Sequence, residues 1–121
     1  MLPNTFVHLP DIGPVTEGEL WGSGIHTWED FLTASSLPER AERNSGQLRS
    51  LVIESQERLD EMDASYFSNA LPRNEMWRLY AEFRDRAAFV DIETTGLSPD
   101  SADITMVGVL DFQGYRAFVR D

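Results

Sequence analysis

The chain of 121 residues contains no cysteine and no lysine, and it has only two histidines. The lack of cysteine excludes disulfides, thiolate zinc sites, iron–sulfur clusters and a cysteine nucleophile. Without cysteine neighbours, we interpret His8 and His26 as packing or surface residues rather than as a zinc pair. No apolar run approaches the roughly 20 residues that a membrane-spanning helix needs, and the N-terminus lacks the basic and apolar regions of a signal peptide. We therefore expect a cytoplasmic protein with no membrane partner.

Positive charge is also scarce. Ten arginines stand against 21 acidic residues, which gives a formal net charge of −11, and residues 1–39 contain no basic residue. A general nucleic-acid binder carries a basic patch or stripe, and no segment of this chain supplies one. Apolar residues make up 41% of the chain, which is enough for a folded core and excludes a disordered acidic tail.

Composition divides the chain into three regions. Residues 1–36 are rich in glycine, tryptophan and turn signals, residues 37–86 have helical patterns throughout, and residues 87–121 change to strand-forming residues. We expect a helix-hairpin-helix-like module, a helical segment and the beginning of a sheet, in that order. The predicted fold class is therefore α/β, with a helical N-terminal half followed by antiparallel strands.

Two short helices are predicted in the first region. Thr16 precedes Glu19 by three residues, and Thr27 precedes Asp30 by three, and both spacings are typical of capping boxes. The turn before the first helix resembles half of a helix-hairpin-helix unit, which binds phosphate through backbone N–H groups. Because Asp11 replaces the usual glycine there and no basic residue is near, we favour a packing module over a DNA-binding one.

The second region is dominated by one amphipathic stripe. Apolar residues recur at helical spacing from Leu48 to Met62, which predicts a long helix with one buried face. Pro72 ends a shorter helix, and Asn74 is expected to cap a further one. Trp77 has a core-like helical spacing, whereas Arg78 is expected on a solvated helix surface.

Three strands are predicted in the last region. Phe89, Asp91 and Glu93 alternate with apolar residues and therefore share one face of the first strand. The second strand, Ile104–Leu110, is nearly all apolar and is expected to be central. The third, Tyr115–Val119, follows after a short turn, so it must run antiparallel to the second.

Asp91 and Glu93 form a candidate metal-binding pair. Two acids on one face of an otherwise apolar strand lie with their Cα atoms about 7 Å apart. If they were buried without a partner, each would cost several kcal/mol. Hard divalent cations such as Mg²⁺ or Mn²⁺ are suitable partners for carboxylate oxygens. The alternative is an edge strand on which both acids face solvent, and alternation alone leaves both interpretations open.

The segment FVDIETTGL resembles the first exonuclease motif of the DnaQ-like, or DEDD, branch of the ribonuclease H fold. This resemblance implies that Asp91 and Glu93 are catalytic residues that bind two Mg²⁺ or Mn²⁺ ions. It also implies a nucleotide-binding turn. The residues of that turn are Thr94, Thr95, Gly96 and Leu97.

The resemblance extends over most of the chain. The segments TFVHLPDIG, YFSNALPRNEMWRLYAEF and FVDIETTGL, in that order, are similar to the YprB-like family of predicted ribonuclease H-like exonucleases. This similarity implies a divalent-metal-dependent 3′→5′ exonuclease that hydrolyses phosphodiester bonds of DNA or RNA. In that family the nuclease domain continues beyond this point, so we expect an incomplete domain that is inactive alone and self-associates through exposed strand edges. The alternative function is a catalytically silent module that binds nucleic acid or protein.

Overall fold

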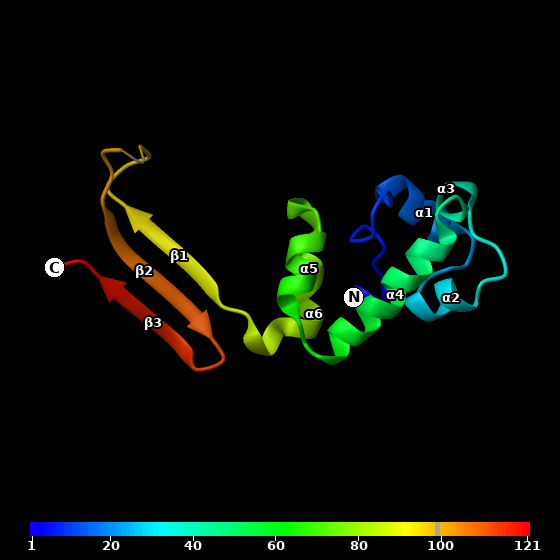
Figure 1. The fold of residues 1–121 in the computed structure, drawn as a ribbon. Helices are drawn as coiled ribbons and strands as arrows, with labels where there is room; N and C mark the ends of the chain where they lie inside the picture. The colour runs from blue at the N-terminus through cyan, green and yellow to red at the C-terminus, as the bar shows by residue number, and fades with distance from the viewer. Residues whose placement is uncertain (99) are drawn as a thin grey trace. The chain divides into compact units, whose positions relative to one another are not determined.

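The computed structural model describes residues 1–98 and 100–121. It divides into two compact units, Met1–Glu82 and Phe83–Asp121. The first unit is helical, and the second contains the three strands (Figure 1). The expected fold class, α/β with a helical N-terminal half and following antiparallel strands, is confirmed.

Short helices make up most of the first unit. After a 3-10 turn, η1 (Leu2–Asn4), the α-helices are α1 (Pro14–Gly22), α2 (Trp28–Thr33), α3 (Glu39–Glu42), α4 (Ser45–Asp60) and α5 (Ala64–Ala70). A 3-10 helix η2 (Arg73–Leu79) leads into α6 (Tyr80–Phe83), and a last 3-10 turn η3 (Arg84–Arg86) lies in the second unit. Among the described residues, no helix has both the length and the apolar character needed to cross a membrane.

The core of the first unit forms between α4 and the elements packed around it. Leu48, Val52 and Ser55 of α4 are buried, which confirms the first part of the predicted apolar stripe. Leu59 is half-buried, and Met62 lies beyond the end of the helix. Phe31 of α2 and Phe67 of α5 are both completely buried. The long helix begins at Ser45, three residues before the predicted stripe. The apolar pattern did not include Ser45, Gly46 and Gln47 because none of them has a large apolar side chain.

The two predicted capping boxes have different outcomes. At α2 the prediction is confirmed, because the Asp30 backbone N–H donates to Thr27 Oγ1 at 3.1 Å and the Thr27 N–H donates to Asp30 Oδ2 at 2.9 Å. At α1 it is wrong: the helix begins at Pro14, and Thr16 lies inside its first turn. Proline fits the first helical position because its missing N–H has no intrahelical partner to lose.

The prediction that Asn74 caps a helix is also wrong. Pro72 occupies the position before η2, and Asn74 lies within that 3-10 helix. The tighter helix turns Arg78 inward and leaves Trp77 61% exposed, so the expectation of a core role for Trp77 is wrong as well. Trp28, by contrast, is 2% exposed and belongs to the core.

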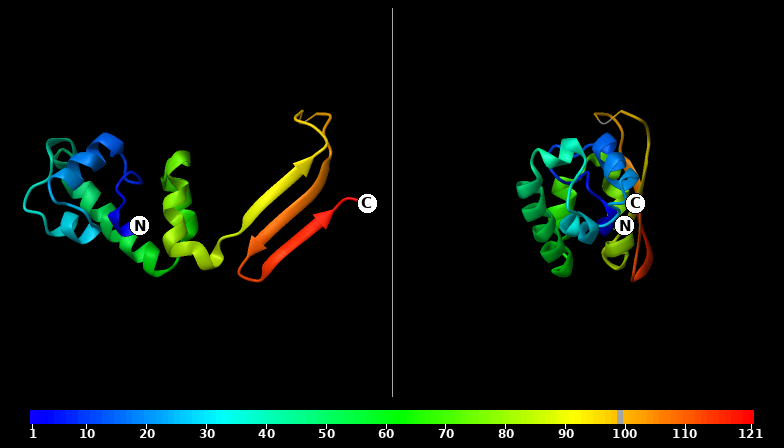
Figure 2. Two further views of the ribbon diagram at one scale, coloured as in Figure 1. Left: turned by 180° about the vertical axis from the view of Figure 1, so that it is seen from behind. Right: turned by 90° about the vertical axis from the view of Figure 1, so that its right-hand side faces the viewer.

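The second unit is a three-stranded antiparallel sheet with the order β1-β2-β3 (Figure 1 and Figure 2). Its strands are β1 (Phe89–Thr94), β2 (Ile104–Asp111) and β3 (Gly114–Val119). The apolar β2 is central, as predicted. Gly114 closes the tight turn with φ of 108°, a conformation that a side chain disfavours. The register places Gly108 opposite Asp91 on one side and opposite Ala117 on the other.

Candidate metal and nucleotide site

Asp91 and Glu93 lie two residues apart in β1, so both side chains project from the same face of the sheet. Their register partners in β2 are Gly108 and Met106. Directly opposite residues of an antiparallel pair share a face, so these two residues form the floor beside the carboxylates. The pair is thus arranged as the alternation predicts.

Both carboxylates are exposed, as is every residue of β1. The premise that their burial would be costly therefore does not hold in this chain, since solvated carboxylates need no compensating charge. The case for a cation rests instead on their chemistry and common face. Mg²⁺ is commonly held by one or two carboxylates, with water and substrate phosphate completing its shell. Asp91 and Glu93 fit that donor set in kind.

The number of ligands is small. In residues 1–98 and 100–121, no group of three or more histidine, cysteine, aspartate or glutamate side chains is placed to hold a metal ion. Two carboxylates leave most of the coordination shell to water and substrate. A cation held by these two carboxylates alone would therefore be weakly bound and open to solvent.

The turn after β1 is closed by hydrogen bonds. Thr94 Oγ1 donates to the Gly96 carbonyl at 2.6 Å. The Asp103 backbone N–H donates to Thr95 Oγ1, and the Thr95 N–H donates back to the Asp103 carbonyl, both at 2.9 Å. Leu97 is fully exposed. Thr95 therefore holds the turn together, while Leu97 presents its side chain to solvent.

A hollow of about 430 Å³ lies at this turn. Its lining is formed by Thr94, Gly96, Leu97, Ser98, Ala102 and Ile104. Three of the four residues expected to bind a nucleotide thus border one space, and the fourth, Thr95, braces it.

A second hollow, of about 230 Å³, lies on the sheet beside Asp91. Its lining is formed by Phe89, Val90, Asp91, Met106, Gly108, Leu110 and Tyr115. The sequence interpretation singled out neither Gly108 nor Tyr115. A glycine inside an apolar strand is a signal of close approach by another group, but its neighbour depends on the register with β3.

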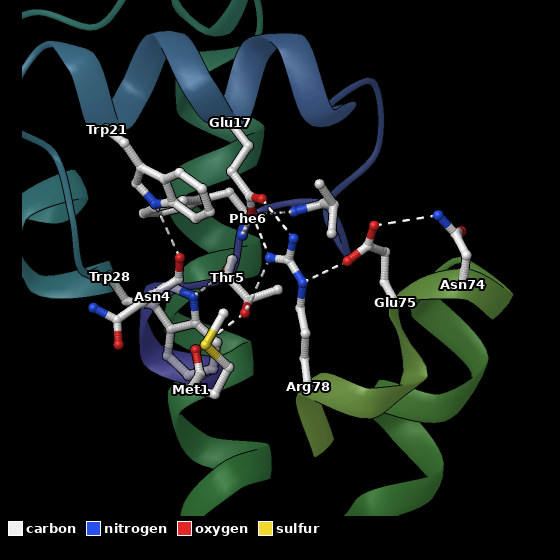
Figure 3. A network of polar contacts seen from close by, with 11 residues as sticks. Met1, Asn4, Thr5, Phe6, Glu17, Trp21, Trp28, Asn74, Glu75 and Arg78 are labelled. Atoms are coloured by element: carbon white, nitrogen blue, oxygen red, sulfur yellow. Dashed lines mark hydrogen bonds and ion pairs between the residues drawn. The ribbon is translucent and has the colours of Figure 1, made fainter. Parts of the chain in front are cut away.

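Arg78 belongs to a buried polar network in the first unit. It is 7% exposed, and its guanidinium meets the Glu17 carboxylate through Nη2–Oε1 at 2.9 Å and Nη1–Oε2 at 3.0 Å (Figure 3). Its Nε donates to Glu75 Oε2 at 2.7 Å, and the Phe6 backbone N–H donates to Glu17 Oε2 at 2.7 Å. The expected solvated position of Arg78 is therefore wrong, and its role is to join η2, α1 and the N-terminal segment.

Electrostatics support this reading of Arg78. Burial by itself lowers the pKa of the guanidinium, but the hydrogen bonds and charges of Glu17 and Glu75 outweigh it and raise the pKa above its usual value. The bidentate geometry satisfies both partners, as a buried ion pair requires.

His8 is a core residue. Its Nε2 lies 2.9 Å from Ser55 Oγ, and its ring lies 5.5 Å from the Trp28 ring and 5.9 Å from the Phe67 ring. Burial lowers the pKa of His8 to about 4, so the imidazole is neutral at pH 7. His26 is exposed.

The turn at Asp11 has two arginines nearby from a later segment of the chain, although residues 1–39 contain none. Arg40 and Arg43 line a hollow of about 540 Å³ together with Asp11 at the hairpin. Arg40 also pairs with Glu19 at 3.6 Å, and Arg43 with Glu39 at 2.8 Å. Nearby glutamates therefore largely neutralise the positive charges of Arg40 and Arg43.

Comparison with known proteins adds one finding about the sheet. Residues 88–120 match a family model described as the RNase H superfamily. The matched segment contains all three strands, both carboxylates and the Thr94–Leu97 turn. The searches of curated proteins and of solved structures found no match. The match indicates a nuclease-type fold for the matched segment.

Proposed function

We propose that this chain forms part of a divalent-metal-dependent 3′→5′ exonuclease of DNA or RNA, of the DEDD type and similar to the YprB-like family. One observation carries the proposal: Asp91 and Glu93 share a face of β1 inside the segment that matches the RNase H superfamily. We also propose that residues 1–36, 37–86 and 87–121 form three regions with separate roles. In this division only the last region contacts the scissile phosphate.

The residues have separate roles in this proposal. Asp91 and Glu93 hold Mg²⁺ or Mn²⁺, and the turn from Thr94 to Leu97 receives the terminal nucleotide. A bound divalent cation polarises phosphoryl oxygens and lowers the pKa of its water. Because two carboxylates cannot by themselves hold two ions, we expect residues 1–121 alone to leave single-stranded DNA and RNA uncleaved.

The proposal is tested by calorimetric titration of the chain with Mn²⁺. We expect weak binding that is lost in Asp91→Asn and in Glu93→Gln, because each variant removes a charged oxygen ligand. Glu57→Gln on the exposed side of α4 is the matched control and should bind as the unchanged chain does. Equal loss of binding in the control would show that Mn²⁺ responds only to total charge, and would contradict the proposal.

A catalytically silent binding module is the second candidate function. The observation that favours it is the pair of carboxylates standing without a third ligand in the part of the chain that the structure describes. In that case Asp91→Asn would leave Mn²⁺ binding unchanged, while the exposed apolar faces of the sheet would still engage a partner. The same titration therefore separates the two candidates.

Self-association is a further element of the proposal. β1 and β3 are the edge strands of the sheet that the structure describes, and an edge strand can pair with a strand of another chain. Val90, Ile92 and Phe118 are all more than half exposed on one face. Sedimentation velocity should show mass increasing with protein concentration, and Ile92→Lys on an edge strand should reduce it. A monomer at all concentrations would contradict this prediction.

A further inference from the structure

Tyr115 lies across a glycine next to the candidate metal site. A Cβ atom placed on Gly108 would meet Tyr115 Oη at 3.2 Å and Tyr115 Cε2 at 3.4 Å. Tyr115 is opposite Leu110 in the register, so its ring runs diagonally across β2 to reach Gly108. Gly108 in turn is the register partner of Asp91. The hydroxyl end of Tyr115 therefore lies on the carboxylate side of the sheet.

Aromatic and apolar side chains surround this position. The hollow of about 230 Å³ is bordered by Phe89, Met106 and Leu110 as well as by Tyr115 and Asp91. Phe89 is 55% exposed and Tyr115 is 65% exposed, so a ligand in solution can reach both side chains. Sites for drug-sized ligands have volumes of roughly 300–1,000 Å³, so this smaller hollow suits a single planar ring system.

The charges on this face select which part of a nucleotide can enter. Asp91 and Glu93 repel a phosphate group unless a cation stands between them. In the strand register Arg116 lies opposite Val109, and Val109 lies opposite Val90. Arg116 therefore projects from the other face of the sheet and does not offset the negative charge of Asp91 and Glu93. A neutral base is compatible with the hollow, because its N–H groups can donate to the Asp91 carboxylate while its ring stacks on Tyr115.

We propose that the hollow formed by Phe89, Gly108 and Tyr115 beside Asp91 binds one unpaired nucleobase of a single-stranded nucleic acid. This inference rests on the proposed function, since the base belongs to the strand whose phosphate the carboxylates hold through a cation. Stacking tolerates any base because every base has a π face, but it requires a base that is free of its pairing partner. Tyr115 therefore favours single-stranded substrates without reading their sequence.

Binding of the base needs no metal, so it is measured by NMR with adenosine as the probe in the presence of EDTA. We expect the backbone signals of Asp91, Gly108 and Tyr115 to shift as adenosine is added. Tyr115→Ala should weaken binding by at least about fivefold, since stacking of one base on an aromatic ring contributes about that much or more. Tyr115→Phe should retain binding, because the ring is kept.

Two further variants make the test independent of whether Tyr115→Ala folds. Gly108→Ala adds a methyl group against the Tyr115 ring and should weaken adenosine binding. Phe118→Ala removes an exposed aromatic ring from the opposite face of the same strand and should leave binding unchanged. Shifts that survive both Gly108→Ala and Tyr115→Ala, or that move to the surroundings of Phe118, would overturn the inference.

The result is distinguishable from failure of the proposed function. Loss of Mn²⁺ binding to Asp91 and Glu93 with adenosine binding retained would count against the metal-dependent nuclease alone. Mn²⁺ binding retained without any adenosine shift at Gly108 and Tyr115 would count against the base-binding hollow alone.

Discussion

The two compact units differ in where their large apolar side chains lie. In Met1–Glu82 most of them are inside, from Leu2 to Leu71, although Trp77 and Tyr80 are exposed. Among the described residues of Phe83–Asp121, Phe83 is the one buried hydrophobic side chain. In the sheet they are outside, with Phe89, Phe118 and others more than half exposed. A three-stranded sheet gains its stability from packing one face against something. Folding stability therefore resides in the helical unit, and the candidate chemistry resides in the sheet.

Polar groups show the same contrast. Glu17 and Arg78 are buried and satisfy each other in a bidentate ion pair. Asp91 and Glu93 are exposed, with their oxygens available to a cation. Charged residues of the helical unit thus hold elements together, whereas the exposed acids of the sheet are available to bind.

The largest expected effect compares two phenylalanines. Phe31 is completely buried, with its ring 5.5 Å from the Phe6 ring, so Phe31→Ala should lower the free energy of unfolding by about 3–5 kcal/mol. Phe118 is 60% exposed, so Phe118→Ala should change it by no more than about 0.5 kcal/mol. Urea titration followed by far-ultraviolet circular dichroism, which reports on helices and strands alike, measures both. Similar losses in the two variants would remove the difference between the units.

The buried ion pair gives the next test. Arg78→Ala leaves the Glu17 carboxylate buried without its partner and should lower the free energy of unfolding by about 3–5 kcal/mol. Protonation of that carboxylate would make the loss smaller. Arg43 pairs with Glu39 at the surface, where both side chains are at least 70% exposed, so Arg43→Ala should cost less than about 1 kcal/mol. A loss in Arg78→Ala no larger than in Arg43→Ala would mean that the network does not join the helices. Thermal unfolding of both variants checks this.

His8 predicts a pH dependence in the helical unit. Burial lowers the pKa of His8 from 6.5 to about 4, so between these values the unfolded chain binds the proton and the folded chain does not. Its contribution to stability is therefore complete above pH 6.5 and is lost as the pH falls toward 4, by about 3 kcal/mol at 1.4 kcal/mol per pH unit.

The measurement is the free energy of unfolding against pH for the unchanged chain and for His8→Gln. The difference between the two curves should narrow as the pH falls from 6.5 to 4, because only the unchanged chain loses this contribution. His26→Gln, at an exposed histidine, is the control and should follow the unchanged chain. A constant difference between the curves over this range would show that His8 does not titrate as the structure indicates.

Local patterns predicted the sheet better than they predicted the helical unit. Alternation placed Asp91 and Glu93 on one face, and the apolar run of β2 predicted its central position. The inward turn of Arg78 could not be predicted in this way, because its partner Glu17 lies 61 positions away. Trp77 was misplaced for the same reason, since the buried ion pair decides which side of η2 faces inward.

The candidate site divides along similar lines. The carboxylates and the Thr94–Leu97 turn are contiguous in sequence, so a short motif is enough to identify them. Gly108 and Tyr115 reach the same face only through the pairing of β1 with β2 and of β2 with β3. Exposure of the carboxylates also depends on what covers the sheet, and alternation carries no information about that.

The most direct measurement of the central claim is a map of paramagnetic broadening by Mn²⁺ over all backbone amides. We expect sub-stoichiometric Mn²⁺ to broaden the signals around Asp91 and Glu93 first, while exposed acids of the helical unit such as Glu57 keep sharp signals. Asp91→Asn should remove the selectivity. Broadening that is equal at Glu57 and at Asp91, or that is centred in the helical unit, would contradict the claim that the sheet carries the metal site.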